Sequence, residues 1–191
     1  MIKAVIFDFG GVIVPDDYNP VIEKAKKKVS REKLLKFQEI EQKAGIGQIG
    51  EQDFIDALND CFGTEVWPKL DVADDRYRAR VDQQILSLIR ELKREYLVGL
   101  LSNNFSFWTK NAKGQAYMSL FDARVFSSDV GMTKPNLAIY RLVAEKINVA
   151  PGECVFIDNV KENVNGAVQA GMKGIQYFGL NDLKTRLEEV L

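Results

Sequence analysis

The stretch AVIFDFGGVIV, residues 4–14, carries the signal that decides the fold. Four apolar residues run directly into Asp8, and two glycines, Gly10 and Gly11, follow almost at once. A short apolar run bounded by turn residues is typical of a strand buried on both faces of a parallel sheet. Asp8 is therefore expected at the carboxyl end of a buried strand, the edge at which open α/β sheets bind their ligands.

Four further apolar runs of this kind follow, with helical patterns between and after them. The expected strands are Ala4–Phe7, Leu97–Leu101, Arg124–Ser127, Cys154–Ile157 and Gly174–Tyr177. The expected helices are Val81–Glu95, Asn136–Ile147, Asn163–Ala170 and Asn181–Leu191. The first two of these helices repeat apolar residues every three or four positions, which gives each an apolar face. The alternation predicts an α/β fold, a Rossmann-like parallel sheet with helices on both faces.

Residues 16–82 break this alternation. They contain helical patterns at Pro20–Val29, Arg31–Ala44 and Glu51–Cys61, then a link that carries Pro68, and no convincing strand. We therefore expect two domains, an α/β core of residues 1–15 and 83–191 and an inserted all-helical cap of residues 16–82. Because the insert leaves from the carboxyl end of the first strand, it is expected to lie over the ligand-binding edge.

The composition of the 191-residue chain is that of an ordinary globular protein, with 46% hydrophobic and 28% charged residues. The net charge of −1 gives no reason to expect a nucleic-acid partner, and the run Lys24–Lys28 is expected to be a solvated helix face. No apolar run approaches the about 18 residues of a membrane span, and no signal-peptide pattern opens the sequence. Cys61 and Cys154 match no metal spacing, which predicts reduced thiols in a cytoplasmic protein.

Polar side chains follow four of the predicted strands. They are Asp8 after the first, Ser102, Asn103 and Asn104 after the second, Lys134 after the third, and Asp158 and Asn159 after the fourth. Each of them alone can serve as a helix cap or as an anchor for a turn. Because the carboxyl ends of parallel strands share one edge, the four sets are expected to converge there.

This set of groups suits a phosphate ester or another small anion. A carboxylate can act as a covalent nucleophile once the negative charge of the substrate is neutralised. A lysine, a hydroxyl and the backbone N–H groups of a glycine turn can neutralise that charge, and paired carboxylates favour Mg²⁺. The chain has no histidine, which excludes the usual general base and any Ser-His or Cys-His nucleophile.

Four stretches resemble the motifs of the haloacid dehalogenase (HAD) superfamily. FDFGGVIV resembles the first motif, LLSNN the second, and VGMTKPNLAIYRLVAEKINVAPGECVFIDNVKENVNGAVQAGM the third and fourth together. The residues Asp8, Ser102, Lys134 and Asp158 follow in order at separations of 94, 32 and 24 positions. GQIGEQDFIDAL, residues 47–58, resembles the start of a cap helix in subfamily I, whose helical cap follows the first motif. The chain is most similar there to the paired-acid group, which includes sugar-phosphate phosphatases and the phosphatase domain of soluble epoxide hydrolases.

The resemblance implies a catalytic role for three residues and a binding role for others. Asp8 would be the nucleophile that forms an aspartyl-phosphate, and Lys134 would hold the nucleophile and the phosphate together. Ser102 would hydrogen-bond the transferring phosphoryl group. Asn103 and the backbone of the Gly10–Gly11 turn would assist it.

The resemblance also implies a Mg²⁺ site formed by Asp8, the backbone carbonyl of Gly10 and the fourth-motif pair Asp158 and Asn159. Asn159 falls where the family usually has the acid that binds the metal directly. An amide offers an oxygen without a charge, so we expect Mg²⁺ to bind weakly. Asn163 falls where a second acid often stands.

Gly10 is the second departure from the family pattern, because phosphatases of the family usually have their general acid/base at this position. General acid/base catalysis is typically worth roughly 10²–10⁴-fold in rate. The glycine therefore predicts slow turnover, a good leaving group, or a proton donor from elsewhere, which would be an acid such as Asp16 or Asp17, the substrate itself, or water.

Three functions follow from this pattern. The first is a Mg²⁺-dependent phosphatase that acts on a small phosphorylated metabolite through an aspartyl-phosphate. The second is a catalytically impaired HAD domain that serves as a binding module, which the loss of acids at Gly10 and Asn159 would explain. The third is a metal-independent 2-haloacid dehalogenase, because a halide leaves without a proton.

The cap is expected to set substrate choice, because it closes over the edge of the sheet and supplies groups opposite the phosphate. The candidates for these groups are Asp16, Asp17, Tyr18 and Gln48 in the cap, with Phe105 and Trp108 after the second motif. The aromatic rings can stack on a substrate or simply pack the cap against the core. The sequence leaves the substrate open, and it fits a monomer or a homodimer.

Overall fold

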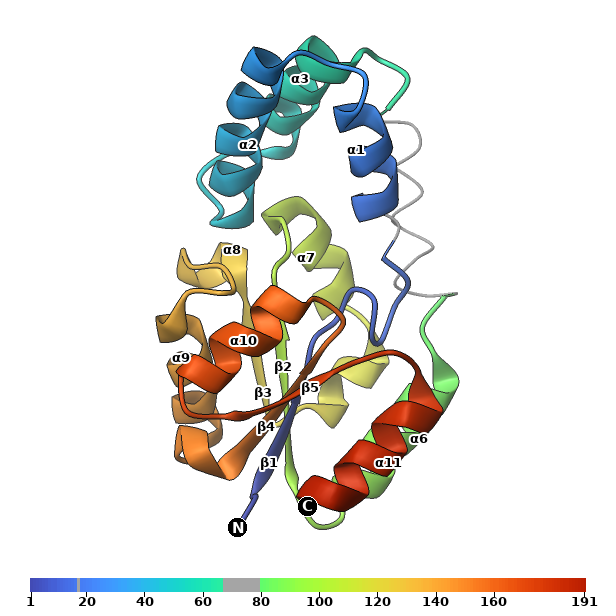
Figure 1. Cartoon of the computed structure of the whole chain (residues 1–191), viewed down its shortest axis with the longest axis vertical. Helices are drawn as coiled ribbons and strands as arrows, with labels where there is room; N and C mark the ends of the chain where they lie inside the picture. The colour runs from blue at the N-terminus through green and yellow to red at the C-terminus, as the bar shows by residue number, and fades with distance from the viewer. Residues whose placement is uncertain (17, 67–79) are drawn as a thin grey trace.

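The computed structural model describes residues 1–16, 18–66 and 80–191, and Figure 1 shows it as two parts, one above the other. The lower part holds a five-stranded sheet with helices on both faces. The upper part holds the cap helices α1 (Tyr18–Lys26), α2 (Arg31–Gly45) and α3 (Glu51–Phe62). Asp17 and the link around Pro68 lie outside the described residues. The limits of the two domains stay a prediction.

The sheet is parallel throughout, in the order β3-β2-β1-β4-β5. The strands are β1 (Ala4–Phe7), β2 (Leu97–Ser102), β3 (Ala123–Phe126), β4 (Cys154–Asp158) and β5 (Lys173–Gln176). Phe7 pairs with Leu100 of β2 and Ile157 of β4, so β1 is central and Asp8 follows it in the middle of the carboxyl edge. The α/β fold predicted from the sequence is confirmed. Ser127, predicted as the end of the third strand, instead begins the short helix α8 (Ser127–Val130).

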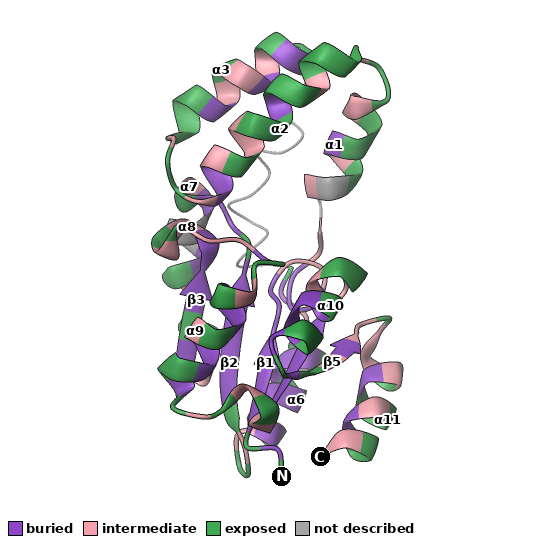
Figure 2. Ribbon diagram, turned by 60° about the vertical axis from the view of Figure 1, so that its left-hand side comes forward, coloured by how far each residue is buried: buried purple, intermediate pink, exposed green. Residues whose placement is uncertain are grey.

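Alternate residues of the strands face two hydrophobic clusters, as the pleat requires. Val5 and Phe7 face one cluster, which is covered by α6 (Gln83–Leu92) and α11 (Leu180–Val190). Ala4 and Ile6 face the other, which is covered by α9 (Leu137–Ile147) and α10 (Lys161–Gln169). The strands β1 and β4 are accordingly buried along their whole length (Figure 2), which is why they appear in the sequence as apolar runs, whereas the edge strand β5 is only partly buried.

Three short elements carry no clear periodicity in the sequence and were not among the expected ones. They are α7 (Ser106–Lys113), η1 (Ala116–Leu120) and η2 (Pro151–Glu153). Helix α7 matters for the site, because it follows directly from the end of β2 and carries the buried Trp108 toward the cap. No described helix has the length and apolar character needed to cross a membrane.

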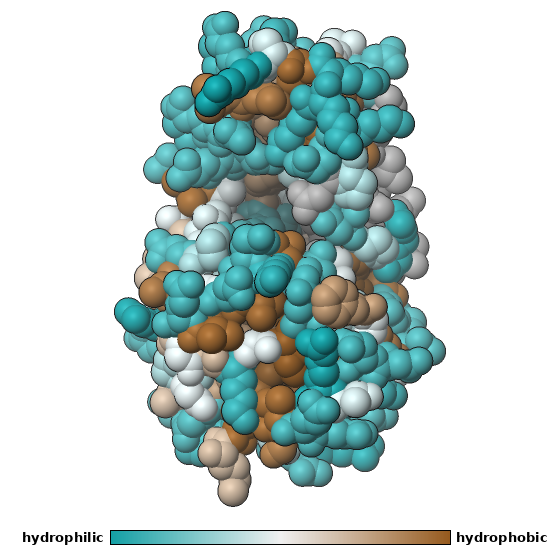
Figure 3. Space-filling view, viewed as in Figure 1, coloured by the Kyte–Doolittle hydropathy of each residue, from teal (hydrophilic) through white to brown (hydrophobic). Residues whose placement is uncertain are grey.

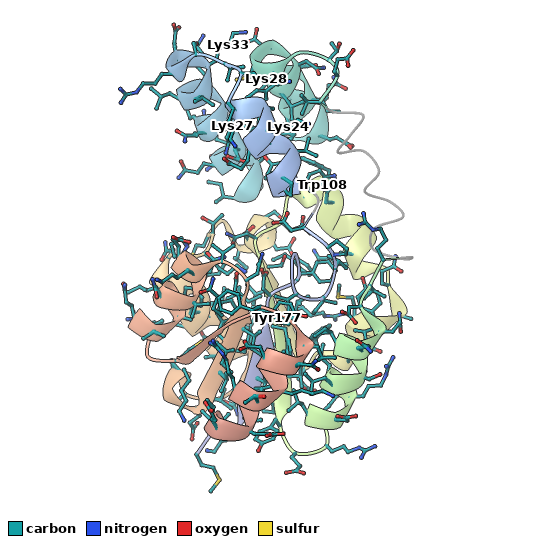
Figure 4. All side chains as sticks on the ribbon, turned by 45° about the vertical axis from the view of Figure 1, so that its right-hand side comes forward. Lys24, Lys27, Lys28, Lys33, Trp108 and Tyr177 are labelled. Carbon is teal, nitrogen blue, oxygen red and sulfur yellow. The ribbon has the colours of Figure 1, made fainter. Side chains whose placement is uncertain are left out.

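The cap helices share one hydrophobic cluster with the core. Phe37 of α2 packs on Phe54 of α3, with ring centroids 5.8 Å apart, and Phe54 packs on Phe105 of the core at 4.8 Å. Lys24, Lys27 and Lys28 are exposed on this upper part (Figure 4), as expected for a solvated run. The apolar contacts therefore fix the cap helices over the carboxyl edge of the sheet.

A buried hydrogen bond joins the end of α2 to the core. The Ser127 hydroxyl donates to the Gly45 carbonyl at 2.6 Å and accepts from the Asn104 N–H at 3.0 Å. Just beyond it, Gly47 has a φ of 76°, and a Cβ there would lie 2.3 Å from the Ser128 carbonyl oxygen. Only glycine fits this close approach, so the turn after α2 is seated on the core.

Candidate active site

The carboxyl edge of the sheet brings a lysine between two aspartates. The Lys134 ammonium lies 2.6 Å from Asp8 Oδ1 and 2.7 Å from Asp158 Oδ2, and it donates a third hydrogen bond to the Leu101 carbonyl at 3.1 Å. An ammonium has three donors, so these contacts use all of them. The three charged side chains are buried, and Lys134 is only 4% exposed. Lys134 is therefore held in one position, with Asp8 directly beside it.

Burial and charge act against one another in this cluster. Burial raises the pKa of the Asp8 carboxyl to about 7, opposed by Lys134 and reinforced by Asp158. Burial lowers the pKa of Lys134, but the charges and hydrogen bonds of the two carboxylates outweigh it and leave that pKa above its usual value. The lysine thus stays cationic, while ionised Asp8 is poorly stabilised until further positive charge arrives.

Both carboxylate oxygens of Asp158 accept hydrogen bonds from other groups of the protein. Its Oδ1 accepts from the Val160 N–H at 2.7 Å, and its Oδ2 accepts from Lys134 and from the Asn163 side-chain amide at 3.0 Å. These bonds fix the loop after β4 as well as the lysine. In this arrangement Asp158 orients Lys134, and its oxygens face donors of the protein.

The glycine turn after Asp8 shapes the opposite side of the site. Gly11 has a φ of 81° and a Cβ there would lie 2.3 Å from Asn159 Nδ2, so the amide of Asn159 rests directly on the turn. Asn159 Oδ1 is buried with no hydrogen-bond partner among the described residues. A Cβ at Gly10 would meet nothing within 4 Å. The site therefore offers one unpaired buried oxygen and an open space at position 10.

Asn103 contacts the backbone of Lys134. Its side-chain amide donates to the Lys134 carbonyl at 3.0 Å, and its Oδ1 accepts from the Lys134 N–H at 2.8 Å. This reciprocal pair fastens the loop after β3 to the end of β2. Ser102, the last residue of β2, is buried beside it and lines the cavity.

A cavity of about 530 Å³ lies between the core edge and the cap helices, where Figure 3 shows the surface hollowed. The residues predicted from the sequence that line it are Asp8, Gly10, Asp16, Tyr18, Ser102, Asn103, Asn104, Phe105, Trp108, Lys134, Asn159 and Asn163. Gly11, Gln48 and Asp158 do not line it; Gly11 and Asp158 lie behind the lining residues that they contact. Among the described residues, no group of three or more Asp, Glu, Cys or His side chains is placed to hold a metal.

One wall of the cavity comes from residues that the sequence analysis missed. We call it the α2 wall, and it consists of Gln38, Glu41, Gln42 and Gly45. The Tyr18 hydroxyl donates to Glu41 Oε1 at 2.6 Å, and Lys26 Nζ lies 3.7 Å from Glu41 Oε2. Their spacing by three and four positions places them on one side of α2, beside its apolar stripe, but only the fold shows that this side faces the cavity.

The other wall is aromatic. The ring of Tyr18 meets Phe105 and Trp108 edge-on, with centroids 5.4 Å and 5.5 Å apart, and Phe105 and Trp108 lie 5.0 Å from one another. Trp108 lies where α7 meets α1 (Figure 4), and it is 7% exposed. These rings pack the cap against the core, and their remaining surface forms an apolar side of the cavity.

Comparisons with known proteins identify the family of the chain. The model of the haloacid dehalogenase-like hydrolases matches residues 2–171. A D-ribitol-5-phosphate phosphatase of Bacteroides thetaiotaomicron is 27% identical over 208 aligned positions, covering 100% of this chain and 99% of the relative. A sesquiterpene phosphatase of Aspergillus oryzae is 28% identical, covering 91% and 88% of the two chains.

Solved structures extend the comparison to three dimensions. A HAD-family enzyme of Bacteroides thetaiotaomicron, an aspartate-to-alanine variant in complex with magnesium and inorganic phosphate, superposes with a TM-score of 0.68 at 25% identity, over 92% of this chain and 94% of that one. An L-2-haloacid dehalogenase of Xanthobacter autotrophicus reaches 0.64 at 22% identity, over 99% and 83%, and shows the shared fold. The subfamily and the paired-acid group stay a prediction. The resemblance to the superfamily is confirmed: the chain belongs to the haloacid dehalogenase-like hydrolase family.

Proposed function

We propose that this protein is a Mg²⁺-dependent phosphatase that hydrolyses a small phosphorylated metabolite through an aspartyl-phosphate at Asp8. The observation that carries the proposal is the position of Asp8 at the base of a cavity of about 530 Å³. Its carboxylate lies 2.6 Å from the ammonium of Lys134, whose three N–H donors are all engaged. A carboxylate needs a positive charge beside it if it is to approach an anionic phosphate. The relatives named as phosphatases and the neighbouring structure with magnesium and phosphate support the same function.

The chemistry requires two displacements at phosphorus. An Asp8 carboxylate oxygen forms a bond to phosphorus while the bond to the ester oxygen breaks, and that oxygen takes a proton from water. Water then attacks the aspartyl-phosphate and gives up a proton to the solvent, the bond between phosphorus and Asp8 breaks, and inorganic phosphate leaves. Lys134 keeps its charge throughout and offsets the negative charge of both carboxylate and phosphate. Ser102 and the N–H groups of the glycine turn are positioned to bind the phosphoryl oxygens.

The residues present fit a divalent cation, though a weakly held one. Asn159 Oδ1 is buried without a partner, and it stands by the same turn as the Asp8 carboxylate and the Gly10 carbonyl. These three oxygens would hold Mg²⁺, which prefers oxygen ligands and keeps several waters. The bound ion would supply the positive charge that ionised Asp8 lacks. Asp158 would act through Lys134, because its own oxygens already accept hydrogen bonds.

Phosphate release tests the proposal. We would assay p-nitrophenyl phosphate and a panel of sugar, polyol and nucleotide monophosphates with Mg²⁺ or with EDTA, on the wild type and on Asp8→Asn. The expected result is release that needs both the metal and Asp8. Release equal to the Asp8→Asn background across the panel would contradict it. Chloride release from 2-chloropropionate that resists EDTA would instead identify a dehalogenase, and binding without any turnover a binding module.

A further inference from the structure

Helix α2 has two faces with different partners. Phe37 and Ala44 are buried in the apolar cluster, with Ile40 packed against it. The α2 wall, Gln38, Glu41, Gln42 and Gly45, faces the cavity instead. Its members are spaced by three, four and seven positions, which places them on one side of a helix. A helix that closes a small-molecule cavity with a row of polar side chains calls for a ligand that can hydrogen-bond to them.

Glu41 is the fixed member of this row. Its two oxygens are held by the Tyr18 hydroxyl at 2.6 Å and by Lys26 at 3.7 Å, and its side chain is 25% exposed. Burial and the nearby carboxylate raise the pKa of Tyr18 well above its usual value, so the tyrosine stays a hydrogen-bond donor. A carboxylate can accept about four hydrogen bonds. Glu41 therefore keeps acceptor capacity for donors that enter the cavity.

The amides on either side of Glu41 complement it. Gln38 and Gln42 can each donate and accept, whereas Glu41 only accepts. Hydroxyl groups on a carbon chain also donate and accept, so a polyhydroxylated chain can satisfy all three side chains. A hydrocarbon chain would remove these side chains from water without replacing their hydrogen bonds. This desolvation is unfavourable for all three, and most of all for the carboxylate. The aromatic wall of Tyr18 and Trp108 provides an apolar surface for the C–H side of such a chain.

We propose that Gln38, Glu41 and Gln42 form a hydroxyl-recognition subsite, and that the substrate is the monophosphate of a polyol or sugar. The inference rests on the proposed phosphatase function, and it assigns the end of the substrate remote from the phosphate to the cap. The cavity volume, about 530 Å³, lies within the range of small-molecule sites. Glu41 is a specificity-determining residue in this arrangement and takes no part in bond breaking.

The test measures binding, so that it does not depend on turnover. Calorimetry in the Asp8→Asn background would compare a pentitol 5-phosphate, farnesyl monophosphate and inorganic phosphate, with and without Glu41→Met. We expect Glu41→Met to weaken the binding of pentitol phosphate at least about 10-fold and to change the affinity for inorganic phosphate less than about twofold. The reason is that only the hydroxylated chain of the pentitol reaches the α2 wall. Glu39→Met is the matched control, because Glu39 pairs with Lys43 outside the cavity and its removal should change neither. Glu41→Gln keeps an acceptor for Tyr18 and covers the case in which the methionine variant does not fold.

Three results would overturn the subsite. They are tighter binding of farnesyl monophosphate than of pentitol phosphate, unchanged pentitol phosphate binding after both Glu41 substitutions, and equal weakening of pentitol phosphate and inorganic phosphate. Failure of the phosphatase proposal looks different. The wild type would then release no phosphate, while the binding pattern of the Glu41 variants would still decide on the subsite.

Discussion

The base of the cavity and its α2 wall hold their charged groups in different ways. At the base, Lys134 is buried and gives all three donors to Asp8, Asp158 and the Leu101 carbonyl. On the wall, Glu41 is a quarter exposed and has one short hydrogen bond and one longer ion pair. Loss of Lys134 at the base leaves two buried carboxylates without their cation, whereas a change on the wall leaves groups that water can still reach.

The chain can therefore vary on the α2 wall without losing its fold, but it cannot lose the lysine at the base. At the base one cation, Lys134, offsets two carboxylates, so the reaction and the stability of the core both depend on this lysine. The wall can change its side chains at little expense in stability, which leaves the choice of substrate open to change. The predictions below test this division, beginning with the residue at the centre of the base.

Lys134→Met should have the largest effect. It leaves Asp8 and Asp158 buried side by side without a cation, and removing one partner of a buried ion pair costs about 3–5 kcal/mol. We expect the free energy of unfolding at pH 8, measured by urea denaturation, to fall by that amount, and phosphate release to disappear. The matched control is Lys113→Met, since Lys113 pairs with Asp129 at 2.6 Å on the surface. That substitution should cost at most about 1 kcal/mol, and equal losses in the two variants would refute the distinction between base and surface.

Gly10→Asp should raise turnover, because it adds the acid that the base lacks. A Cβ at position 10 would meet nothing within 4 Å, so the side chain has room. General acid catalysis helps poor leaving groups most, so we expect kcat for an alkyl phosphate to rise at least about 10-fold, with a much smaller gain for p-nitrophenyl phosphate. Gly10→Asn has the same shape and cannot transfer the proton. If both variants gave the same gain, the missing acid would not be what limits the enzyme.

The sequence predicted the base of the site well, for a physical reason. Strands buried on both faces must be apolar along their length, so the first polar residue after each run marks the carboxyl edge. Asp8 and Ser102 could be placed together from that rule, whereas Lys134 stands eight positions after Phe126, the last residue of β3, so the rule alone does not select it. The contact of Asp158 with Lys134 could not be predicted either, because neighbouring residues of a strand end point in different directions. Which of Asp158 and Asn159 faces the glycine turn depends on the side-chain packing of the folded loop.

The α2 wall and the short helices could not be predicted from the sequence, for other reasons. Polar residues on a helix indicate a face turned toward water, and only the position of α2 above the sheet edge makes Gln38 and Glu41 part of a cavity. Helix α8 is four residues long, too short for a periodic pattern, so Ser127 was taken into the preceding strand. Its hydrogen bond to Gly45 spans 82 positions, and no local pattern predicts such a contact.

The smallest predicted effect is that of Asp8→Asn on the melting temperature. It tests whether the buried position of the Asp8 carboxylate serves the reaction and lowers the stability of the fold. Without metal, burial raises the pKa of Asp8 to about 7, from an ordinary value of 3.8. The folded protein therefore holds this proton more tightly than the unfolded chain, and the stability that it contributes is present below pH 4 and lost as the pH rises through 7. Asp8→Asn removes that dependence of stability on pH.

In EDTA at pH 8 we expect the variant to melt at least about 3 °C above the wild type, since 1 kcal/mol corresponds to roughly 2–4 °C in a chain of this size. At pH 4 the difference should vanish, and at pH 8 added Mg²⁺ should narrow it by stabilising the wild type. A variant that melts below the wild type at pH 8 would mean that the bond to Lys134 outweighs burial, and that the nucleophile is held without any loss of stability.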